Sequence, residues 1–209
     1  MDRHRGAAGV KHLREIGFVL VLASICTLVM SGGDVLLRPP PGVSPEFMAR
    51  ALALVSGLAA PAPESTVNPA SESAPAERLA VSFQAAFLPI RGRAEGVYRA
   101  RLRPELLLCE QEGNGMWGKI RLLVAFDDQS GCLADVSVIA QSETPGLGTR
   151  IAEPEFENRF VRLPATSGVR LATAAARIEA GEVSAITGAT ISCAAVVKTV
   201  QTALEKLKQ

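Results

Sequence analysis

The chain has 209 residues, which is enough for one domain of ordinary size with additional segments. Its 22 lysines and arginines nearly balance its 21 aspartates and glutamates, and aromatic residues make up 4% of the sequence, with a single tryptophan. Without a basic excess or aromatic side chains for base stacking, the composition excludes an ordinary nucleic-acid-binding protein. It also excludes a solvating acidic tail.

The N-terminal segment changes abruptly from basic to apolar. Residues 1–15 carry an excess of lysine and arginine, whereas residues 16–33 carry no charged side chain. At ~1.5 Å per residue, the apolar stretch approaches the ~30 Å thickness of a hydrocarbon core. We therefore expect a cytoplasmic basic tail at 1–15, a transmembrane anchor at 16–33, and an exported remainder. The alternative is a cleaved signal peptide, because Ser31 and Gly33 could serve at a cleavage site.

Cysteines and histidines give little basis for a metal or acid–base centre. Three cysteines follow the anchor, where an oxidising compartment permits disulfides; Cys109 and Cys132 could be bridged, which leaves Cys193. The odd count and the lack of a Cys-x-x-Cys spacing argue against a metal site. The two histidines, His4 and His12, both precede the anchor. We therefore expect neither a metal site nor catalytic residues.

Residues 34–90 are expected to connect the anchor to a compact domain. A helical stretch is expected at 47–60, and residues 61–76, rich in Pro, Ser, Ala and Glu, have the composition of a linker. A short helix at 78–88 is expected to end at Pro89, because proline cannot continue a helix.

Residues 91–209 are expected to form that domain. Alternating apolar residues predict short strands at 96–102, 105–110, 119–126 and 133–140. The third of these has Ile120, Leu122, Val124 and Phe126 on one face. A short helix is expected at 155–160, residues 169–180 fit strand or helix, and apolar residues at helical spacing predict a last helix at 193–208 that packs on the sheet. The predicted fold is α+β, a small antiparallel sheet covered by helices and preceded by one transmembrane helix.

Three glycine-bearing stretches are the candidate functional motifs. They are Gly-Asn-Gly-Met-Trp-Gly at 113–118, Glu-Thr-Pro-Gly-Leu-Gly at 143–148 and Thr-Gly-Ala-Thr at 187–190. Each alone is typical of a turn, and Thr-x-x-Thr before a helix is typical of a helix cap. A helix start with small residues can also hold a phosphate on its free N–H groups. None of the stretches is a P-loop or a dinucleotide fingerprint.

Together, the second and third stretches resemble the FMN-binding domain of membrane electron-transfer complexes. The similarity is to the C subunit of the sodium-translocating NADH:quinone reductase and the G subunit of the Rnf complex, and it covers residues ~95–209. It implies FMN bound covalently through a phosphoester to Thr190. The resemblance implies that the rest of the cofactor site is formed by Thr187, Gly188, Ala189, Glu143, Thr144, Gly146, Leu147, Gly148 and Trp117. The loop at 143–148 would cover the flavin ring, with Leu147 on its face and Thr144 at its polar edge. Met116 and Trp117 could add an apolar wall, although a core position for Trp117 is the alternative.

Two positions depart from the family pattern. Members usually have an acidic residue three positions before Thr187, where this chain has Ser184. If the flavin transferase reads that acid, attachment could be slower or absent. Members often have histidine two positions before Glu143, where this chain has Gln141, which would change hydrogen bonding near the flavin.

The resemblance implies a membrane-anchored flavoprotein subunit that relays electrons within an ion-translocating NADH:quinone or ferredoxin:NAD oxidoreductase complex. It would be a single-pass protein of the cytoplasmic membrane with its C-terminal domain on the outer side, not catalytic alone. Its partners would be other membrane subunits and a flavin transferase. One alternative is an exported, membrane-tethered binding or assembly module that holds FMN non-covalently or not at all, which Ser184 favours. Another is an exported flavin-dependent reductase, with Glu143 as the acid near the flavin.

Overall fold

The computed structural model describes residues 43–57, 73–90, 95–165, 168–172 and 179–208. The chain divides into two compact units, Met1–Pro39 and Pro40–Gln209, and all the described residues belong to the second unit. The expected basic tail and anchor, with Cys26, lie outside the described residues, as does most of the expected linker at 61–76. In the part of the chain that is described, no helix is long and apolar enough to cross a membrane.

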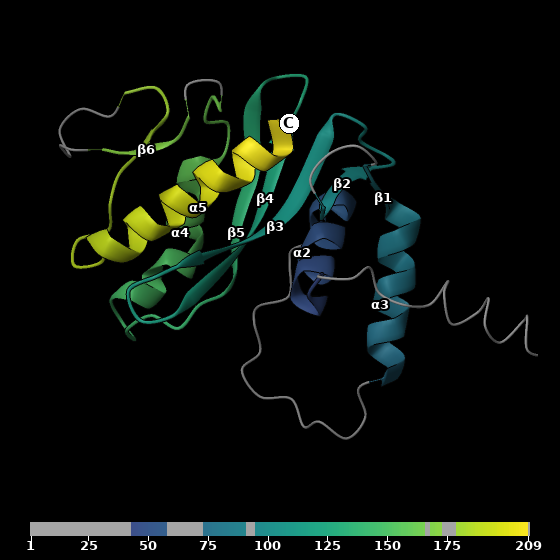
Figure 1. Ribbon diagram of the computed structural model, residues 1–209, viewed down its shortest axis with the longest axis horizontal. Helices are drawn as coiled ribbons and strands as arrows, with labels where there is room; N and C mark the ends of the chain where they lie inside the picture. Colours follow the sequence, from purple (N-terminus) through teal and green to yellow (C-terminus); the bar gives the residue numbers. More distant parts are fainter. Residues whose placement is uncertain (1–42, 58–72, 91–94, 166–167, 173–178, 209) are drawn as a thin grey trace, which may run out of the picture. The chain divides into compact units, whose positions relative to one another are not determined.

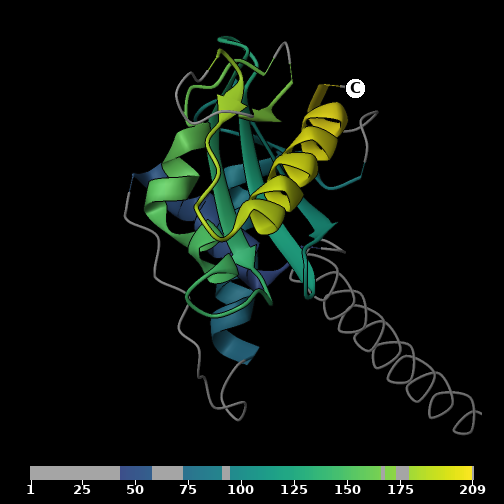
Figure 2. The same cartoon turned by 90° about the vertical axis from the view of Figure 1, so that its left-hand side faces the viewer.

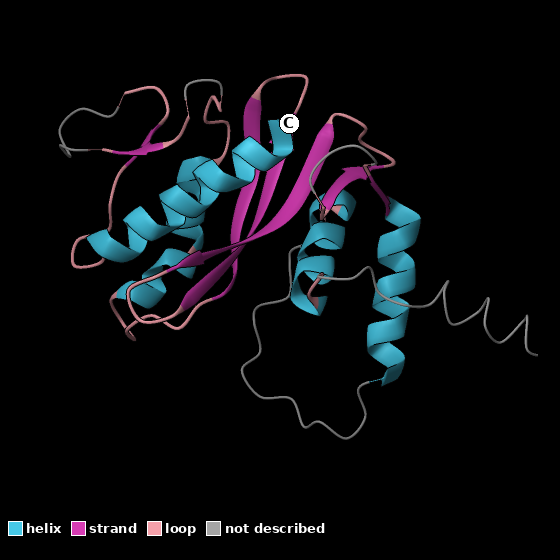
Figure 3. Ribbon diagram, viewed as in Figure 1, coloured by secondary structure: helices cyan, strands magenta, loops and turns pink. Residues whose placement is uncertain are grey.

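Five antiparallel strands form the central sheet, in the order in which they follow one another along the chain (Figures 1 and 3). They are β1 (Phe87–Pro89), β2 (Val97–Ala100), β3 (Leu106–Asn114), β4 (Lys119–Asp127) and β5 (Cys132–Ala140). The four strands expected from alternation are therefore confirmed, with β3 longer than predicted. Gly113 and Asn114, expected in a turn, pair with Ile120 and Lys119 in the β3–β4 ladder. The turn itself is formed by residues 115–118 and is closed by a 2.7 Å bond from the Gly115 N–H to the Gly118 carbonyl.

Helices cover both faces of this sheet. α5 (Thr190–Lys208) contacts β3 and β4 on one face, as expected for the last helix, and Figure 2 shows it lying across these strands. α2 (Pro45–Ser56) and α3 (Ser73–Ala86) lie on the other face; α2 contacts β4 and β5, and α3 contacts β1. Two buried clusters result, one under α5 and one under α2 and α3. This two-sided burial explains why β4 is almost continuously apolar.

Alternate residues of each strand belong to opposite clusters. On β4, Ile120, Leu122, Val124 and Phe126 belong to the cluster under α5, as predicted. Leu123 and Ala125 face α2 and α3 instead. Side chains of successive strand residues point to opposite faces, so a helix on each face is needed to bury both sets.

The segment that precedes β2 is more ordered than its composition suggests. α2 begins after Ser44, whose hydroxyl accepts a 3.2 Å bond from the Phe47 N–H, and ends at Gly57, whose φ of 68° is left-handed. This glycine explains why α2 ends earlier than the predicted residue 60. α3 begins inside the expected linker and ends at Ala86, so the predicted end at Pro89 is wrong. Pro89 lies in the edge strand β1, where a missing N–H is tolerated.

An aromatic cluster joins this N-terminal segment to the sheet. The Phe83 ring centroid lies 5.8 Å from that of Phe47 on α2, 4.7 Å from Phe87 on β1 and 5.1 Å from Tyr98 on β2. All four rings are buried. The compact part of the chain therefore includes residues on the N-terminal side of residue 91.

Short elements connect β5 to α5. They are η1 (Gly148–Ala152), α4 (Pro154–Glu157), η2 (Asn158–Phe160) and the parallel pair β6 (Arg170–Leu171) and β7 (Glu182–Val183). α4 and η2 fill the helix predicted at 155–160. Within 169–180, residues 170–171 are strand and residues 173–178 lie outside the described residues.

The bridge between Cys109 and Cys132 that the sequence left open does not form, because both thiols are free. Cys109 pairs with Val124 on one side of β4, and Cys132 pairs with Asp127 on its other side. Two strand spacings of ~4.8 Å and a shift of three residues along the strands separate them, far beyond the ~6 Å Cα separation of a disulfide. Burial raises the pKa of the Cys109 thiol to about 12, so this cysteine is an inert core residue.

A half-buried pair of carboxyls lies where α2 meets β5 and α4. Glu157 accepts a 2.7 Å bond from the Val138 N–H, and its other oxygen is 4.0 Å from the Arg50 guanidinium. Burial raises the pKa of Glu157 from its ordinary 4.5 to about 7, and the nearby Asp135 carboxyl adds to the rise. Burial also raises the pKa of Asp135. One arginine thus faces two carboxyls that resist ionisation.

Folding stability is expected to fall as pH rises from about 4.5 to about 7. In that window the unfolded chain has already released the Glu157 proton, while the folded chain still holds it. The resulting loss is on the order of 2 kcal/mol after allowance for partial exposure. Urea unfolding of the chain and of Glu157→Gln at pH 5 and pH 8 measures it. The variant should lose less stability between the two pH values, and equal losses would contradict the assignment.

Candidate cofactor site

The three glycine-bearing stretches meet at the side chain of Glu143. This side chain is only 5% exposed. Its Oε1 accepts bonds from the Met116 N–H at 2.8 Å and the Trp117 N–H at 3.2 Å, both in the β3–β4 turn. Its Oε2 accepts a 2.6 Å bond from the Ser192 hydroxyl in the first turn of α5. A single carboxylate thus joins the turn at 115–118, the loop at 143–148 and the start of α5.

Two glycines, which have no side chain, make room for the side chain of Glu143. A Cβ atom on Gly115 would lie 2.2 Å from Glu143 Oε1, and one on Gly148 would lie 2.7 Å from Glu143 Cβ and 2.9 Å from Ser192 Oγ. Neither approach is possible for a larger residue without displacing the carboxylate. The resemblance placed Gly148 in a loop that would cover the flavin, and the structure gives both glycines a packing role around Glu143.

The loop at 143–148 is tightly turned. The Thr144 carbonyl accepts bonds of 3.2 Å from the N–H groups of both Leu147 and Thr149. Gly146 has a left-handed φ of 73°, and its N–H donates to the Thr149 hydroxyl at 3.0 Å. Gln141, one of the departures from the family pattern, accepts a 2.6 Å bond from the Glu143 N–H. The loop therefore holds its shape through its own bonds and presents the Thr144 and Leu147 side chains to solvent.

The third stretch forms the start of α5. This helix begins at Thr190, earlier than predicted, because the Cys193 N–H already bonds to the Ala189 carbonyl at 2.9 Å. Gly188 has a φ of 84°, a left-handed conformation that favours glycine. The cap position belongs to Ala189, so neither Thr187 nor Thr190 acts as the capping residue. Both threonines are exposed, and Thr190 is the first residue of the helix.

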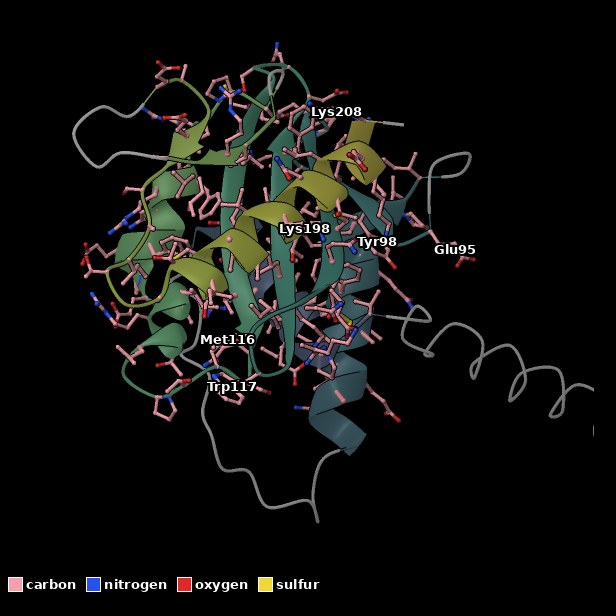
Figure 4. The ribbon with its side chains drawn as sticks, turned by 60° about the vertical axis from the view of Figure 1, so that its left-hand side comes forward. Glu95, Tyr98, Met116, Trp117, Lys198 and Lys208 are labelled. Atoms are coloured by element: carbon pink, nitrogen blue, oxygen red, sulfur yellow. The ribbon has the colours of Figure 1, made fainter. Side chains whose placement is uncertain are left out.

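Large apolar side chains are exposed on the first two stretches and directly after the third. Met116, Trp117, Leu147 and Ile191 have exposed fractions between 49% and 68%, with Trp117 the highest. Figure 4 labels Met116 and Trp117 on the turn between β3 and β4. The alternative of a core tryptophan is therefore wrong. Exposed apolar side chains on separate segments are typical of surfaces that bind an apolar group.

Ser184, the other departure from the family pattern, is bound to Arg159. The Arg159 guanidinium donates to the Ser184 carbonyl at 2.9 Å and to its hydroxyl at 3.0 Å. It also pairs with Glu155 at 3.0 Å and lies over the Phe156 ring at 5.6 Å. The segment before Thr187 is thereby fixed to η2.

Among the described residues, no three His, Cys, Asp or Glu side chains come together as metal ligands. The chemistry of this region is that of exposed hydroxyls, backbone N–H groups and apolar side chains.

Comparison with known proteins identifies the region that holds these stretches. Residues 115–205 match the model of the FMN-binding domain. This segment is similar to members of that domain family. The matched segment contains the second and third motifs and residues 115–118 of the first, and it extends into α5. It does not include α2, α3 or the first three strands, which complete the core around it.

Two curated relatives are subunits of ion-translocating complexes. The G subunit of the ion-translocating oxidoreductase complex of Methanosarcina acetivorans is 38% identical over 98 residues, covering 47% of this chain and 49% of the relative. The G subunit of the proton-translocating ferredoxin:NAD(+) oxidoreductase complex of Clostridium ljungdahlii is 34% identical over 96 residues, covering 46% and 50%. The chain thus spans about half the length of these relatives.

Two solved structures are also similar to this chain. The C subunit of the Na(+)-translocating NADH-quinone reductase from Parabacteroides distasonis gives a TM-score of 0.45 at 25% identity, covering 52% of this chain and 58% of that one. NqrC of Shewanella oneidensis gives a TM-score of 0.39 at 21% identity, covering 54% and 60%.

Sequence reasoning missed the hydrogen-bond partners of Glu143. Glu143 was singled out for its position near a flavin, whereas its partners, the Met116 and Trp117 N–H groups and the Ser192 hydroxyl, were not. One signal was present. Ser192 is a polar residue on the buried face of α5, and a buried hydroxyl needs a partner.

Proposed function

We propose that this chain is a flavoprotein subunit of a membrane-bound, ion-translocating oxidoreductase complex, with FMN bound through a phosphoester to Thr190. The observation that carries the proposal is the exposed Thr190 at the first residue of α5, within a segment similar to the FMN-binding domain family. FMN, when bound, supplies the one-electron redox chemistry, and the chain supplies attachment, orientation and shielding.

The start of α5 suits a phosphate. The first N–H groups of a helix have no partner within it, and the helix dipole favours an anion there. Gly188, with its left-handed backbone, carries no side chain in front of these groups. Ala189 is small and buried, so its side chain does not compete for the same space. Thr187 is exposed three residues before Thr190 and serves as a supporting hydroxyl in the proposal.

The apolar side chains suit a flavin ring. Leu147 extends toward the third stretch, because its Cδ2 would lie 3.2 Å from a Cβ atom on Gly188. Met116 and Trp117 supply large apolar surfaces from the β3–β4 turn, and an aromatic side chain can stack on a flavin ring. Thr144 and the backbone N–H groups of its loop are the polar groups for the edge of the ring. These side chains would bury a ring that is attached at Thr190.

The site needs no separate catalytic acid or base. Both oxygens of Glu143 are already engaged by three donors, and the two histidines of the sequence precede residue 16. This arrangement favours an electron-carrying subunit over a flavin-dependent reductase that acts on its own small substrate.

Membrane location and partners follow from the sequence and from the relatives' names. Residues 16–33 are the proposed anchor of a single-pass protein, with residues 1–15 on the cytoplasmic side. The domain built around residues 91–209 would work on the outer side of the membrane. Other membrane subunits of the complex would be its partners, as for the two relatives that are named as subunits of such complexes. A flavin transferase would attach the FMN.

One observation favours a second function. The residue three positions before Thr187 is Ser184, held by Arg159, where the family usually has an acid. A transferase that reads an acid there would not modify this chain. The chain would then be a membrane-tethered binding or assembly module that holds FMN non-covalently or not at all.

Expression of the full chain with and without a flavin transferase distinguishes the two functions. Covalent attachment should add the mass of FMN less one water, and should give a band that fluoresces under ultraviolet light on a denaturing gel. Both signals should depend on the transferase. An unmodified chain in the presence of an active transferase would overturn the covalent site and favour the assembly module.

A further inference from the structure

We propose that Glu143 is a positioning residue for the cofactor site: its carboxylate holds the β3–β4 turn, the 143–148 loop and the start of α5 in one arrangement. This inference rests on the proposed function only where it concerns the flavin. The three segments carry Met116, Trp117, Leu147 and Ile191, the exposed apolar side chains that would receive the ring. Their relative positions are fixed beneath the surface by one side chain.

The hydrogen bonds of Glu143 are specific and span long distances in sequence. The bonds to Met116 and Trp117 cross 27 and 26 residues, and the bond from Ser192 crosses 49. Hydrogen bonds to a charged acceptor are about twice as strong as neutral ones, and burial strengthens them further.

The negative charge of Glu143 is balanced by dipoles. None of the salt bridges among the described residues involves Glu143. Two backbone N–H groups, one hydroxyl and the positive end of the α5 dipole surround the carboxylate. Because dipoles stabilise a charge only in the correct orientation, the carboxylate imposes an orientation on the turn and on the helix start.

The surrounding glycines allow no substitute arrangement. A side chain on Gly115 or Gly148 would enter the space of the carboxylate, as the 2.2 Å and 2.7 Å approaches to Glu143 atoms indicate. The cavity is therefore shaped to a side chain of this length. A shorter residue at position 143 would leave the cavity unfilled and three donors without a partner.

Two substitutions at position 143 differ in whether the three hydrogen bonds of the side chain can still form. In Glu143→Gln, the amide oxygen can accept from the Met116 and Trp117 N–H groups, and the amide nitrogen can donate to Ser192, because a hydroxyl both donates and accepts. Glu143→Ala removes all three bonds. The glutamine variant is therefore the matched control, since it keeps the connections without the charge.

Amide hydrogen exchange of the full chain without flavin, followed by NMR, tests directly whether Glu143 holds the three segments together. Glu143→Ala should speed exchange at Met116 and Trp117 by about tenfold to a hundredfold, the loss of a buried, charge-assisted hydrogen bond. Glu143→Gln, which keeps these bonds without the charge, should speed exchange less, by about threefold to tenfold. Amides in the middle of β4, such as Val124, should not change. Equal acceleration at Val124 and at the turn, or none at the turn, would overturn the proposal.

Flavin attachment provides the second readout. With the transferase present, Glu143→Ala should incorporate FMN at less than about a tenth of the rate of the unmodified chain, and Glu143→Gln should restore the rate to within about threefold. If the unmodified chain incorporates no flavin, the proposed function fails, but the hydrogen-exchange data still test whether Glu143 holds the three segments together. Incorporation of FMN by Glu143→Ala at the rate of the unmodified chain would overturn the role of Glu143 in positioning the cofactor site.

A variant that leaves Glu143 in place covers the case in which Glu143→Ala fails to fold. Ser192→Ala removes only the bond to α5 and shortens a side chain by one atom. It should slow flavin attachment by about tenfold while leaving the exchange of the Met116 and Trp117 amides within about threefold. Unchanged attachment would overturn the link between the loop and α5.

Discussion

Replacement of Thr190 by alanine is expected to abolish covalent attachment of FMN completely. A phosphoester needs a hydroxyl oxygen, and alanine offers none. Thr190 is exposed and is the first residue of α5, so the substitution should change stability by no more than about 0.5 kcal/mol. Intact mass and fluorescence of the denatured protein, made with a flavin transferase, measure the loss separately from any loss of folding.

Thr187→Ala is the matched control for this prediction. It makes the same chemical change at an exposed threonine of the same motif, three positions earlier. Attachment should persist in this variant, with a reduced rate if the Thr187 hydroxyl helps to hold the phosphate. Thr190→Ser should also retain attachment, because it keeps the hydroxyl. Covalent flavin in Thr190→Ala would show that another residue carries the cofactor.

Replacement of Phe83 by alanine is expected to lower the free energy of unfolding by about 3–5 kcal/mol. Phe83 is 1% exposed and contacts the rings of Phe47, Phe87 and Tyr98, which belong to α2, β1 and β2. Its removal would leave a cavity where both N-terminal helices meet the sheet. Urea unfolding of the full chain, followed by circular dichroism, measures the effect.

Val81→Ala on the same helix is the control. Val81 is 45% exposed, so its truncation should cost less than about 1 kcal/mol. A comparably small cost for Phe83→Ala would contradict the prediction. It would mean that α2 and α3 do not unfold cooperatively with the sheet, and that the residues before β2 are not part of the same folding unit. A cost in the expected range would make the N-terminal helices part of the folded unit that carries the cofactor site.

Local patterns in the sequence were sufficient for the middle of the fold. The alternation of apolar residues in β4 identifies a strand and the face that α5 covers, because successive side chains of a strand point to opposite sides. The spacing of Val196, Val200 and Leu207 likewise predicts the buried face of α5. The two helices before β2 were also predicted, but their packing on the sheet, which extends the compact part beyond the expected start at residue 91, was not.

The sequence by itself determined which chemical groups the cofactor site can contain. The resemblance of its motifs to a known family is the basis for proposing Thr190 as the hydroxyl for a phosphoester, with Gly188 two positions before it. It also contains no histidine after the proposed anchor, which leaves the site without an obvious acid or base. These conclusions depend on residue identity and short spacing, which can be read without coordinates.

Only the tertiary structure decided how the site is assembled. The bonds of Glu143 join residues 26 to 49 positions apart, and no local period encodes such an approach. The exposure of Trp117 and the packing roles of Gly115 and Gly148 depend on the same convergence. The physical reason is that a buried carboxylate must find its donors wherever the fold brings them, and here the sheet and α5 bring them together from three segments.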